Sequence, residues 1–190
     1  MNTEENIDKR VFVAVAGVIS AIGNDLAANL RSLAQSLAGI GKMRYLESFY
    51  KDEIPVAEVK LSNSELAAKA GVPGSWSRTA MLSLVAAREA IKDAGINISS
   101  YRTGFISANT VGGMDKTEEF FEEFLNYHSK GRLKDVVNHE CGAVTEVVAD
   151  ELGINAYVST ISTACSSSAN AIFFGARMIR HGFLDIVVAG

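Results

Sequence analysis

The sequence is poor in cysteine, which excludes several classes of protein. Its 190 residues include only two cysteines, Cys141 and Cys165. Two are too few for a disulfide framework or for a structural zinc site. Because free cysteines are typical of reducing compartments, we expect a cytoplasmic protein without a metal site.

Proline, positive charge and long hydrophobic runs are also scarce. Two prolines beside 16 glycines do not indicate long disordered linkers. The net charge is -4, whereas a nucleic-acid-binding surface needs a basic excess, so we expect no nucleic-acid partner. No stretch reaches the roughly 20 apolar residues that span a membrane. The segment before the apolar run at residues 11–19 is slightly acidic, unlike a secretory signal.

Strand and helix patterns alternate along the chain. Runs of β-branched and apolar residues predict strands over residues 11–18, 104–108, 156–162 and 184–189. Apolar spacing and capping residues predict helices over residues 25–37, 64–70, 78–94, 115–130, 136–152 and 166–180. This alternation predicts an α/β fold with a mainly parallel sheet.

The last predicted strand, residues 184–189, is apolar throughout apart from Asp185, and we expect it to lie inside a sheet. The sequence stops directly after it, at Gly190. Chain ends usually lie at the protein surface. We therefore expect a truncated chain, cut within or just after this fourth core strand.

The surroundings of Cys165 are those of a nucleophile elbow. A predicted strand runs into a turn of small residues that holds Cys165, and a helix follows at once. Free N–H groups and the helix dipole at such a position favour a thiolate. The helix is apolar nearly all round, so we expect it to be buried and Cys165 to be shielded from water. The alternative is that Cys165 is simply a small buried hydrophobe.

Residues 163–172, with the sequence TACSSSANAI, resemble the active-site signature of the β-ketoacyl-acyl-carrier-protein synthases. Residues 11–23 resemble the opening strand and turn of this family, and residues 86–95 its first core helix. Residues 111–113 resemble its glycine turn, and residues 185–190 a later strand. The resemblance covers essentially all 190 residues.

The resemblance implies a thiolase-like fold, layered α-β-α-β-α in the full enzyme, of which residues 1–190 are the N-terminal half. It implies an acyltransferase, a 3-oxoacyl-ACP synthase that extends fatty-acid or polyketide-type chains by decarboxylative Claisen condensation. Cys165 would carry the acyl group, and its backbone N–H would be one oxyanion donor. Val111 would border the acyl pocket, unless it is ordinary core packing.

The resemblance also implies the partners. The substrates would arrive on the phosphopantetheine arm of an acyl carrier protein, and no separate cofactor is implied. The protein would form a homodimer or a related heterodimer. The basic cluster with which many relatives face the carrier protein is reduced here to Lys69 and Arg78. Residues 135–152 match the better-known fatty-acid synthases weakly, which favours a specialised branch, such as an aryl polyene or polyketide-like pathway.

The resemblance places two histidines, a lysine and a second oxyanion donor in the second half of family members. The histidines in residues 1–190 are not expected to replace them. His181 follows Cys165 by 16 residues, or roughly 22 Å along a helix, too far for a base. We interpret His128 and His139 as surface or capping residues as well. We therefore expect the 190-residue chain alone to be inactive.

Three other functions are weighed against the condensing enzyme. A chain-length factor shares the fold but lacks the cysteine, so Cys165 argues against it. A cysteine hydrolase needs a histidine within reach of the thiol, and no convincing candidate exists. A redox sensor needs an exposed thiol with a resolving partner, and the apolar helix argues against exposure. The remaining conspicuous residues are interpreted as core or dimer contacts (Phe120, Phe121, Phe124), a solvated helix face (Glu118, Glu119, Glu122, Glu123) and a structural cysteine (Cys141).

Overall fold

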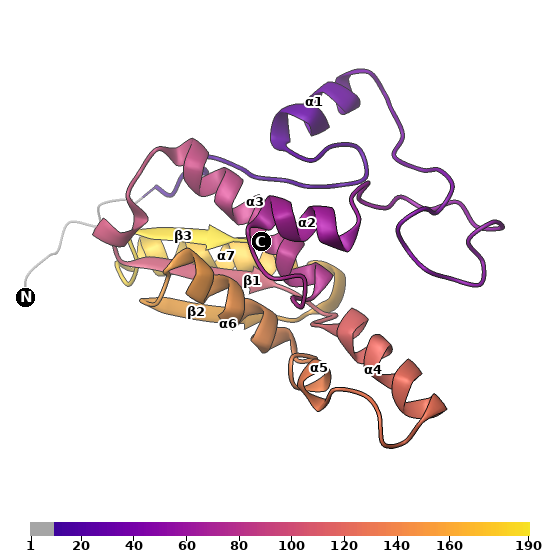
Figure 1. Ribbon diagram of the computed structural model, residues 1–190. Helices are drawn as coiled ribbons and strands as arrows, with labels where there is room; N and C mark the ends of the chain where they lie inside the picture. Colours follow the sequence, from indigo (N-terminus) through magenta and orange to yellow (C-terminus); the bar gives the residue numbers. More distant parts are fainter. Residues whose placement is uncertain (1–9) are drawn as a thin grey trace, which may run out of the picture.

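A three-stranded parallel sheet is the centre of the molecule (Figure 1). The computed structural model describes residues 10–190, so residues 1–9 of the predicted domain lie outside the described residues. The strands are β1 (Thr103–Ala108), β2 (Tyr157–Ile161) and β3 (Ile186–Ala189), in the order β2-β1-β3. Gly104 pairs with Tyr157 on one side and with Val187 on the other. The predicted α/β class and the parallel sheet are confirmed.

Strand β3 lies at an edge of the sheet formed by the described residues, which does not test its expected interior position in the predicted full domain. One expectation about the strands is wrong. Residues 11–18 are extended but form no strand, and Phe12 and Val13 are exposed. The N–H of Val18 donates to the Glu89 carboxylate instead of to a strand (2.9 Å). This segment runs across a helix, since a Cβ on Gly17 would lie 1.9 Å from the Ala86 carbonyl oxygen.

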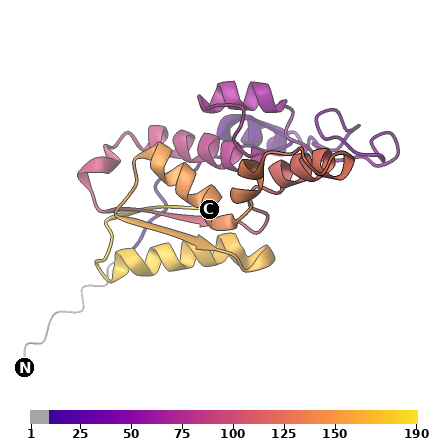
Figure 2. The same ribbon diagram turned by 60° about the horizontal axis from the view of Figure 1, so that its bottom comes forward.

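Helices cover both faces of the sheet (Figure 2). Helix α6 (Cys141–Leu152) packs on β2 and β1, and α3 (Arg78–Ala94) packs on α6. Helix α7 (Ser167–Arg180) covers the other face. Fully buried apolar side chains of the described core include Leu66, Met81, Leu84, Ile106 and Val148.

Side-chain capping fixes the helices that precede the sheet. The Ser77 hydroxyl accepts the Ala80 N–H at 3.3 Å, and Gly95 ends α3 with a φ of 63°, so the predicted bounds of α3 are confirmed. Helix α2 (Asn63–Ala70) also matches its prediction, and a capping box of Ser62 and Glu65 begins it. Helix α1 (Leu26–Ala34) begins at Asp25 as expected but ends three residues early.

The predicted helix over residues 136–152 is interrupted. Helices α4 (Met114–Asn126) and α5 (Leu133–Val137) pack on each other and project from the sheet (Figure 1). Residues 138–140 separate α5 from α6 because their backbone lies against the glycine turn after β1. A Cβ on Gly112 would lie 1.8 Å from the His139 carbonyl oxygen, and one on Gly113 would lie 2.3 Å from that of Asn138.

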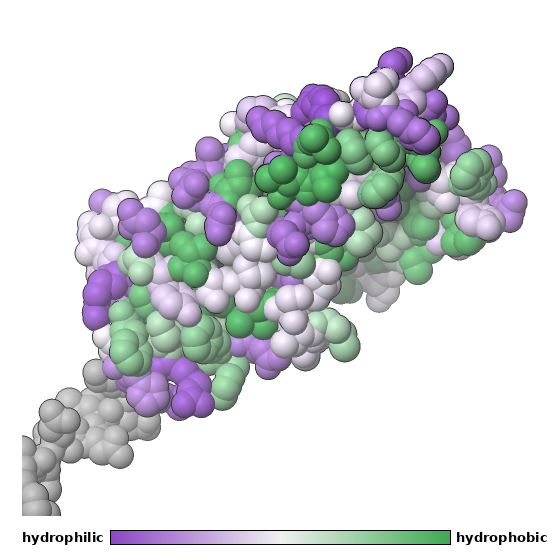
Figure 3. All heavy atoms as spheres, turned by 90° about the horizontal axis from the view of Figure 1, so that it is seen from below, coloured by the Kyte–Doolittle hydropathy of each residue, from purple (hydrophilic) through white to green (hydrophobic). Residues whose placement is uncertain are grey.

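Several apolar side chains are exposed. Helix α7 buries Ala171 and Gly175 against the sheet, whereas Ile172 and Phe173 are exposed, so the prediction of a fully buried helix is wrong. Leu125 and Leu133 in the α4–α5 projection are exposed as well. Seen from below, the surface carries hydrophobic residues, drawn in green, among polar ones (Figure 3).

Candidate active site

Cys165 lies in a single 3₁₀ turn, η2 (Ala164–Ser166), between the end of β2 and the start of α7. The predicted order of strand, turn and helix is therefore found. Ala164 has a φ of 52°, in the left-handed region that residues other than glycine seldom adopt. Such backbone strain is typical of functional turns and needs support from the surrounding structure.

Hydroxyl groups around the cysteine provide that support. The Thr163 carbonyl accepts bonds from the Ser166 N–H (3.2 Å) and the Ser166 hydroxyl (2.7 Å). The Ser167 hydroxyl accepts the Thr163 N–H (2.9 Å) and donates to the Ala164 carbonyl (2.7 Å). The Asn170 amide donates to the Thr163 hydroxyl (2.9 Å). These bonds hold the two residues before Cys165 in one conformation.

Sequence reasoning missed this network. From the sequence, the serines were expected only to leave space around Cys165, and Asn170 had no role beyond its place in the motif. The available signal was the tendency of Ser, Thr and Asn side chains to bond nearby backbone groups at helix starts. The spacing of Thr163, Ser166, Ser167 and Asn170 fits that tendency, since each pair falls within two turns of a helix.

The thiol is more accessible than the sequence indicated. Cys165 is exposed, so the prediction of a shielded cysteine is wrong for the described chain. Within residues 10–190, no hydrogen bond engages its backbone N–H, and no side chain caps the start of α7. The Ser166 N–H donates to the Thr163 carbonyl and the Ser167 N–H donates to the Ala164 carbonyl, so at this turn it is the Cys165 N–H that is free to bind an oxyanion.

Val111 lies at the same edge of the sheet as Cys165. Val111 follows β1 by three residues, Cys165 follows β2 by four, and the ends of these strands, Ala108 and Ile161, are register partners. The carboxyl edge of a parallel sheet is where α/β proteins usually bind ligands. Val111 is 48% exposed, so it is not a core residue in the described structure.

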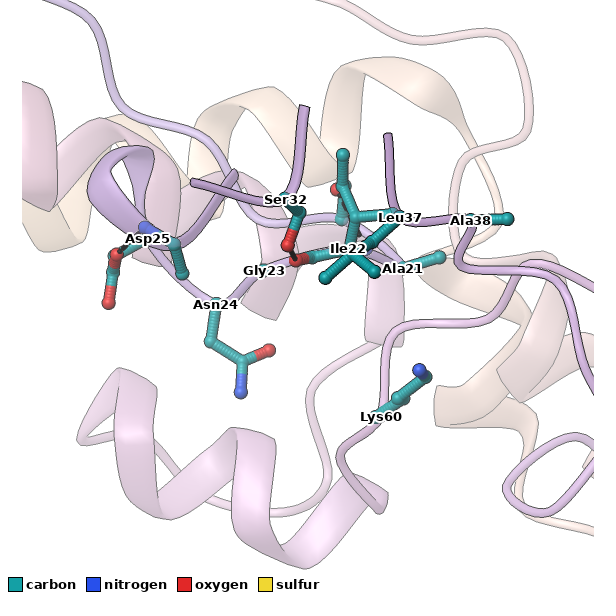
Figure 4. A pocket seen from close by; sticks show the side chains of 11 residues that line it. Ala21, Ile22, Gly23, Asn24, Asp25, Ser32, Leu37, Ala38 and Lys60 are labelled. Atoms are coloured by element: carbon teal, nitrogen blue, oxygen red, sulfur yellow. Dashed lines mark hydrogen bonds between the residues drawn. The ribbon is translucent and has the colours of Figure 1, made fainter. Parts of the chain in front are cut away.

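Two hollows in the described residues lie away from Cys165 and Val111. One cavity, of about 460 Å³, is bounded by residues 20–25, α1 and Lys60 (Figure 4). Hydrogen bonds within its wall, such as that from the Ser32 hydroxyl to the Ile22 carbonyl (2.7 Å), already engage several of its polar groups. The other, of about 230 Å³, lies between the start of α3, α5 and α6. The candidate site is an open edge and not an enclosed pocket.

The three histidines are exposed, as predicted. His181 is the C-cap of α7, at the far end of the helix from Cys165. The His139 ring bonds the Thr117 hydroxyl (2.9 Å), and the His128 ring lies 5.2 Å from that of Phe124. Among residues 10–190 there is no group of three potential metal ligands.

Of the two residues expected to remain from the basic cluster, Arg78 is bonded within the protein and Lys69 is free of such bonds among the described residues. The Arg78 guanidinium bonds the Asn63 side chain (2.8 Å) and the carbonyls of Val59 and Leu61 (both 3.0 Å). Lys69 is exposed. Among the described helices, none is both long and apolar enough to cross a membrane.

Comparison with protein families gives a match over nearly the whole chain. Residues 8–190 match the family described as "Beta-ketoacyl synthase, N-terminal domain". Nodulation protein E of Rhizobium meliloti is 27% identical over 188 residues, covering 97% of this chain and 46% of the relative. The 3-oxoacyl-[acyl-carrier-protein] synthase 1 of Buchnera aphidicola is 28% identical, covering 96% and 46%. This chain spans about half the length of these relatives.

Solved structures share the fold at lower identity. The ishigamide ketosynthase/chain length factor superposes with a TM-score of 0.80 at 21% identity, covering 94% of this chain and 46% of the other. A type II polyketide ketosynthase solved with its acyl-carrier protein gives 0.74 at 21% identity, covering 95% and 44%. The predicted thiolase-like fold is confirmed.

Proposed function

Because the chain belongs to the β-ketoacyl synthase family, as its N-terminal domain, we propose that the protein is a carrier-protein-dependent condensing enzyme. The observation that supports this most directly is the placement of Cys165 in a strained, hydrogen-bonded elbow at the start of α7. A chain-length factor would share the fold but would not need such a cysteine.

The elbow is suited to carry an acyl group. The Cys165 thiolate attacks the carrier thioester carbonyl and forms a carbon–sulfur bond, the carbon–sulfur bond to the carrier arm breaks, and the carrier leaves as its thiolate. Negative charge develops on the carbonyl oxygen, and the Cys165 backbone N–H, which has no hydrogen-bond partner within residues 10–190, would donate to it.

Condensation would follow from a second carrier thioester. Malonyl-carrier loses carbon dioxide, and the resulting carbanion attacks the acyl-cysteine and releases the Cys165 thiolate. The family resemblance assigns the histidines and lysine that assist this step to positions outside residues 1–190. The chain described here contributes the nucleophile, one oxyanion donor and Val111 as a border of the acyl channel.

We propose an acyl carrier protein and a related synthase subunit as partners. In the solved neighbours, one ketosynthase is in complex with its acyl-carrier protein and another with its chain length factor. Of the expected basic cluster, Lys69 is the only residue that is exposed. Docking of the carrier protein would therefore depend less on charge here than in relatives that have the full cluster. The free cysteines Cys141 and Cys165 are compatible with a cytoplasmic location.

Replacement of the cysteine tests the function. In the full-length protein, Cys165→Ser should abolish covalent loading from acyl-carrier thioester, because a serine hydroxyl is not ionised at this site. Intact-mass spectrometry detects the added acyl group. Cys141→Ser is the matched control, since Cys141 is the other free cysteine and begins α6. Undiminished loading of the Cys165 variant would exclude the proposed nucleophile.

A further inference from the structure

Asn109 is a buried polar residue at the candidate site that the function proposed above does not use. It directly follows β1 and is 6% exposed. Its side-chain oxygen accepts the N–H groups of Val111 and Gly112, both at 3.0 Å. Its side-chain nitrogen has no hydrogen-bond partner within the described chain.

The same residue is bonded to the strand that leads to the cysteine. The Asn109 backbone N–H donates to the carbonyl of Ile161 (3.2 Å), the last residue of β2. Four residues later the chain reaches Cys165. Asn109 is therefore bonded to β2 through its backbone and to the turn that carries Val111 through its side chain.

The turn is also held from its outer side. Gly112 has a φ of 58°, and its Cα faces the His139 carbonyl oxygen so closely that only glycine fits. The Gly113 N–H donates to that same carbonyl (3.2 Å). With residues 138–140 outside and Asn109 inside, the turn has little freedom, and Val111 is fixed relative to the end of β2.

We infer that Asn109 is a positioning residue that sets the distance between Val111 and Cys165 and thereby the acyl-chain selectivity of the enzyme. The inference rests on the proposed function, because it assumes that Val111 borders the acyl channel. Asn109 touches neither the nucleophile nor the acyl group in this role. It acts through the two backbone N–H groups that it holds.

Two variants of Asn109 test whether its side-chain oxygen holds the turn. Asn109→Ala removes the acceptor and should release the turn. Asn109→Asp keeps an acceptor for both N–H groups, and this chain already contains a buried carboxylate in such a role. Glu58 is 7% exposed and accepts the N–H groups of Arg44, Tyr45 and Leu46 at 2.6 to 3.0 Å.

Asn97→Ala is the matched control for these variants. The exposed side chain of Asn97 accepts the Ser99 N–H before β1, away from the candidate site.

The experiment measures loading and selectivity in the full-length protein. Competing acyl-carrier thioesters that differ by two carbons are supplied, and acyl-Cys165 is quantified by mass spectrometry. In Asn109→Ala, total loading should persist while discrimination between the two chains falls by about tenfold, the range that one methylene contributes in an apolar pocket. Asn109→Asp and Asn97→Ala should keep the wild-type ratio. Hydrogen exchange over residues 109–113 should accelerate only in Asn109→Ala.

The outcomes distinguish this inference from the function on which it rests. If the wild type forms no acyl-Cys165, the proposed function fails and the inference with it. If the wild type loads but Asn109→Ala keeps its selectivity while exchange of the turn accelerates, only the inference fails. If Asn109→Asp loses selectivity although its turn stays protected, the amide itself contacts substrate, and the positioning role is wrong.

Discussion

The sequence left two interpretations of Val111, and its exposure in the structure favours one of them. As a valine after a strand it could have been ordinary core, but it is 48% exposed at the edge that carries Cys165. Val111→Phe should therefore fold normally and shift the enzyme towards shorter acyl chains, because the larger side chain occupies channel volume. The product lengths can be measured by mass spectrometry of the released acyl chains.

The control for this substitution is Val13→Phe, since Val13 is another exposed valine, in the extended segment before α1. It should leave the product lengths unchanged. A Val111 variant with the wild-type length distribution would show that the residue does not border the channel.

An ion pair adds to the backbone pairing between the starts of β1 and β3. Arg102, just before β1, bonds both oxygens of Asp185, just before β3, at 2.6 and 3.1 Å. The side-chain bond from Arg102, followed by its backbone N–H bond and its charge, lowers the pKa of Asp185 to about 2 from the ordinary 3.8. A carboxyl with a lowered pKa stabilises the folded state above its ordinary pKa.

Asp185→Asn should consequently lower the urea midpoint at pH 7, by an amount limited by the exposure of the pair. The difference from wild type should shrink as the pH falls from about 4 towards 2, as the native carboxyl becomes protonated. Asp150→Asn, a change at an exposed carboxyl on α6, should have little effect at any pH. A difference that stayed constant over this range would contradict the ion-pair assignment.

The extended segment 11–18 is held against α3 by backbone proximity at Gly17. A Cβ there would lie 1.9 Å from the Ala86 carbonyl oxygen, so Gly17→Ala should displace the segment and destabilise the fold by about 1–3 kcal/mol. Gly74→Ala is the matched control, because a Cβ at Gly74 meets nothing within 4 Å. Urea unfolding of both variants measures the difference, and equal midpoints would show that the segment does not pack as described.

At the scale of the whole molecule, the described chain leaves apolar side chains exposed on several elements. Ile172 and Phe173 on α7, Leu125 on α4 and Leu133 on α5 are examples. The purified 190-residue chain should therefore self-associate, which light scattering after size-exclusion chromatography detects. Replacing Ile172 and Phe173 with glutamine should reduce the association, whereas a monomeric wild-type chain would contradict this expectation.

Local patterns in the sequence were sufficient for most elements. Helix α3 has the predicted bounds because Ser77 and Gly95 act on neighbouring backbone groups, whatever the rest of the fold does. The same holds for the elbow at Cys165, where small residues, a strand and a helix start are adjacent in the sequence. The parallel sheet followed from the alternation of strands and helices.

Tertiary contacts decided the rest, because they join residues that the sequence separates. Residues 11–18 lie against α3 and not in the sheet, and their contacts are with Ala86 and with Glu89, which takes the Val18 N–H from 71 positions away. The break between α5 and α6 depends on the glycine turn at 112–113, against which residues 138–140 lie. The sequence alone determined the elbow at Cys165, which arises from adjacent residues, and the fold class, which arises from the alternation of strand and helix patterns. Only the tertiary structure placed Val111, Asn109 and Cys165 at one edge, because strand pairing brings the ends of β1 and β2 together across more than 50 residues of chain.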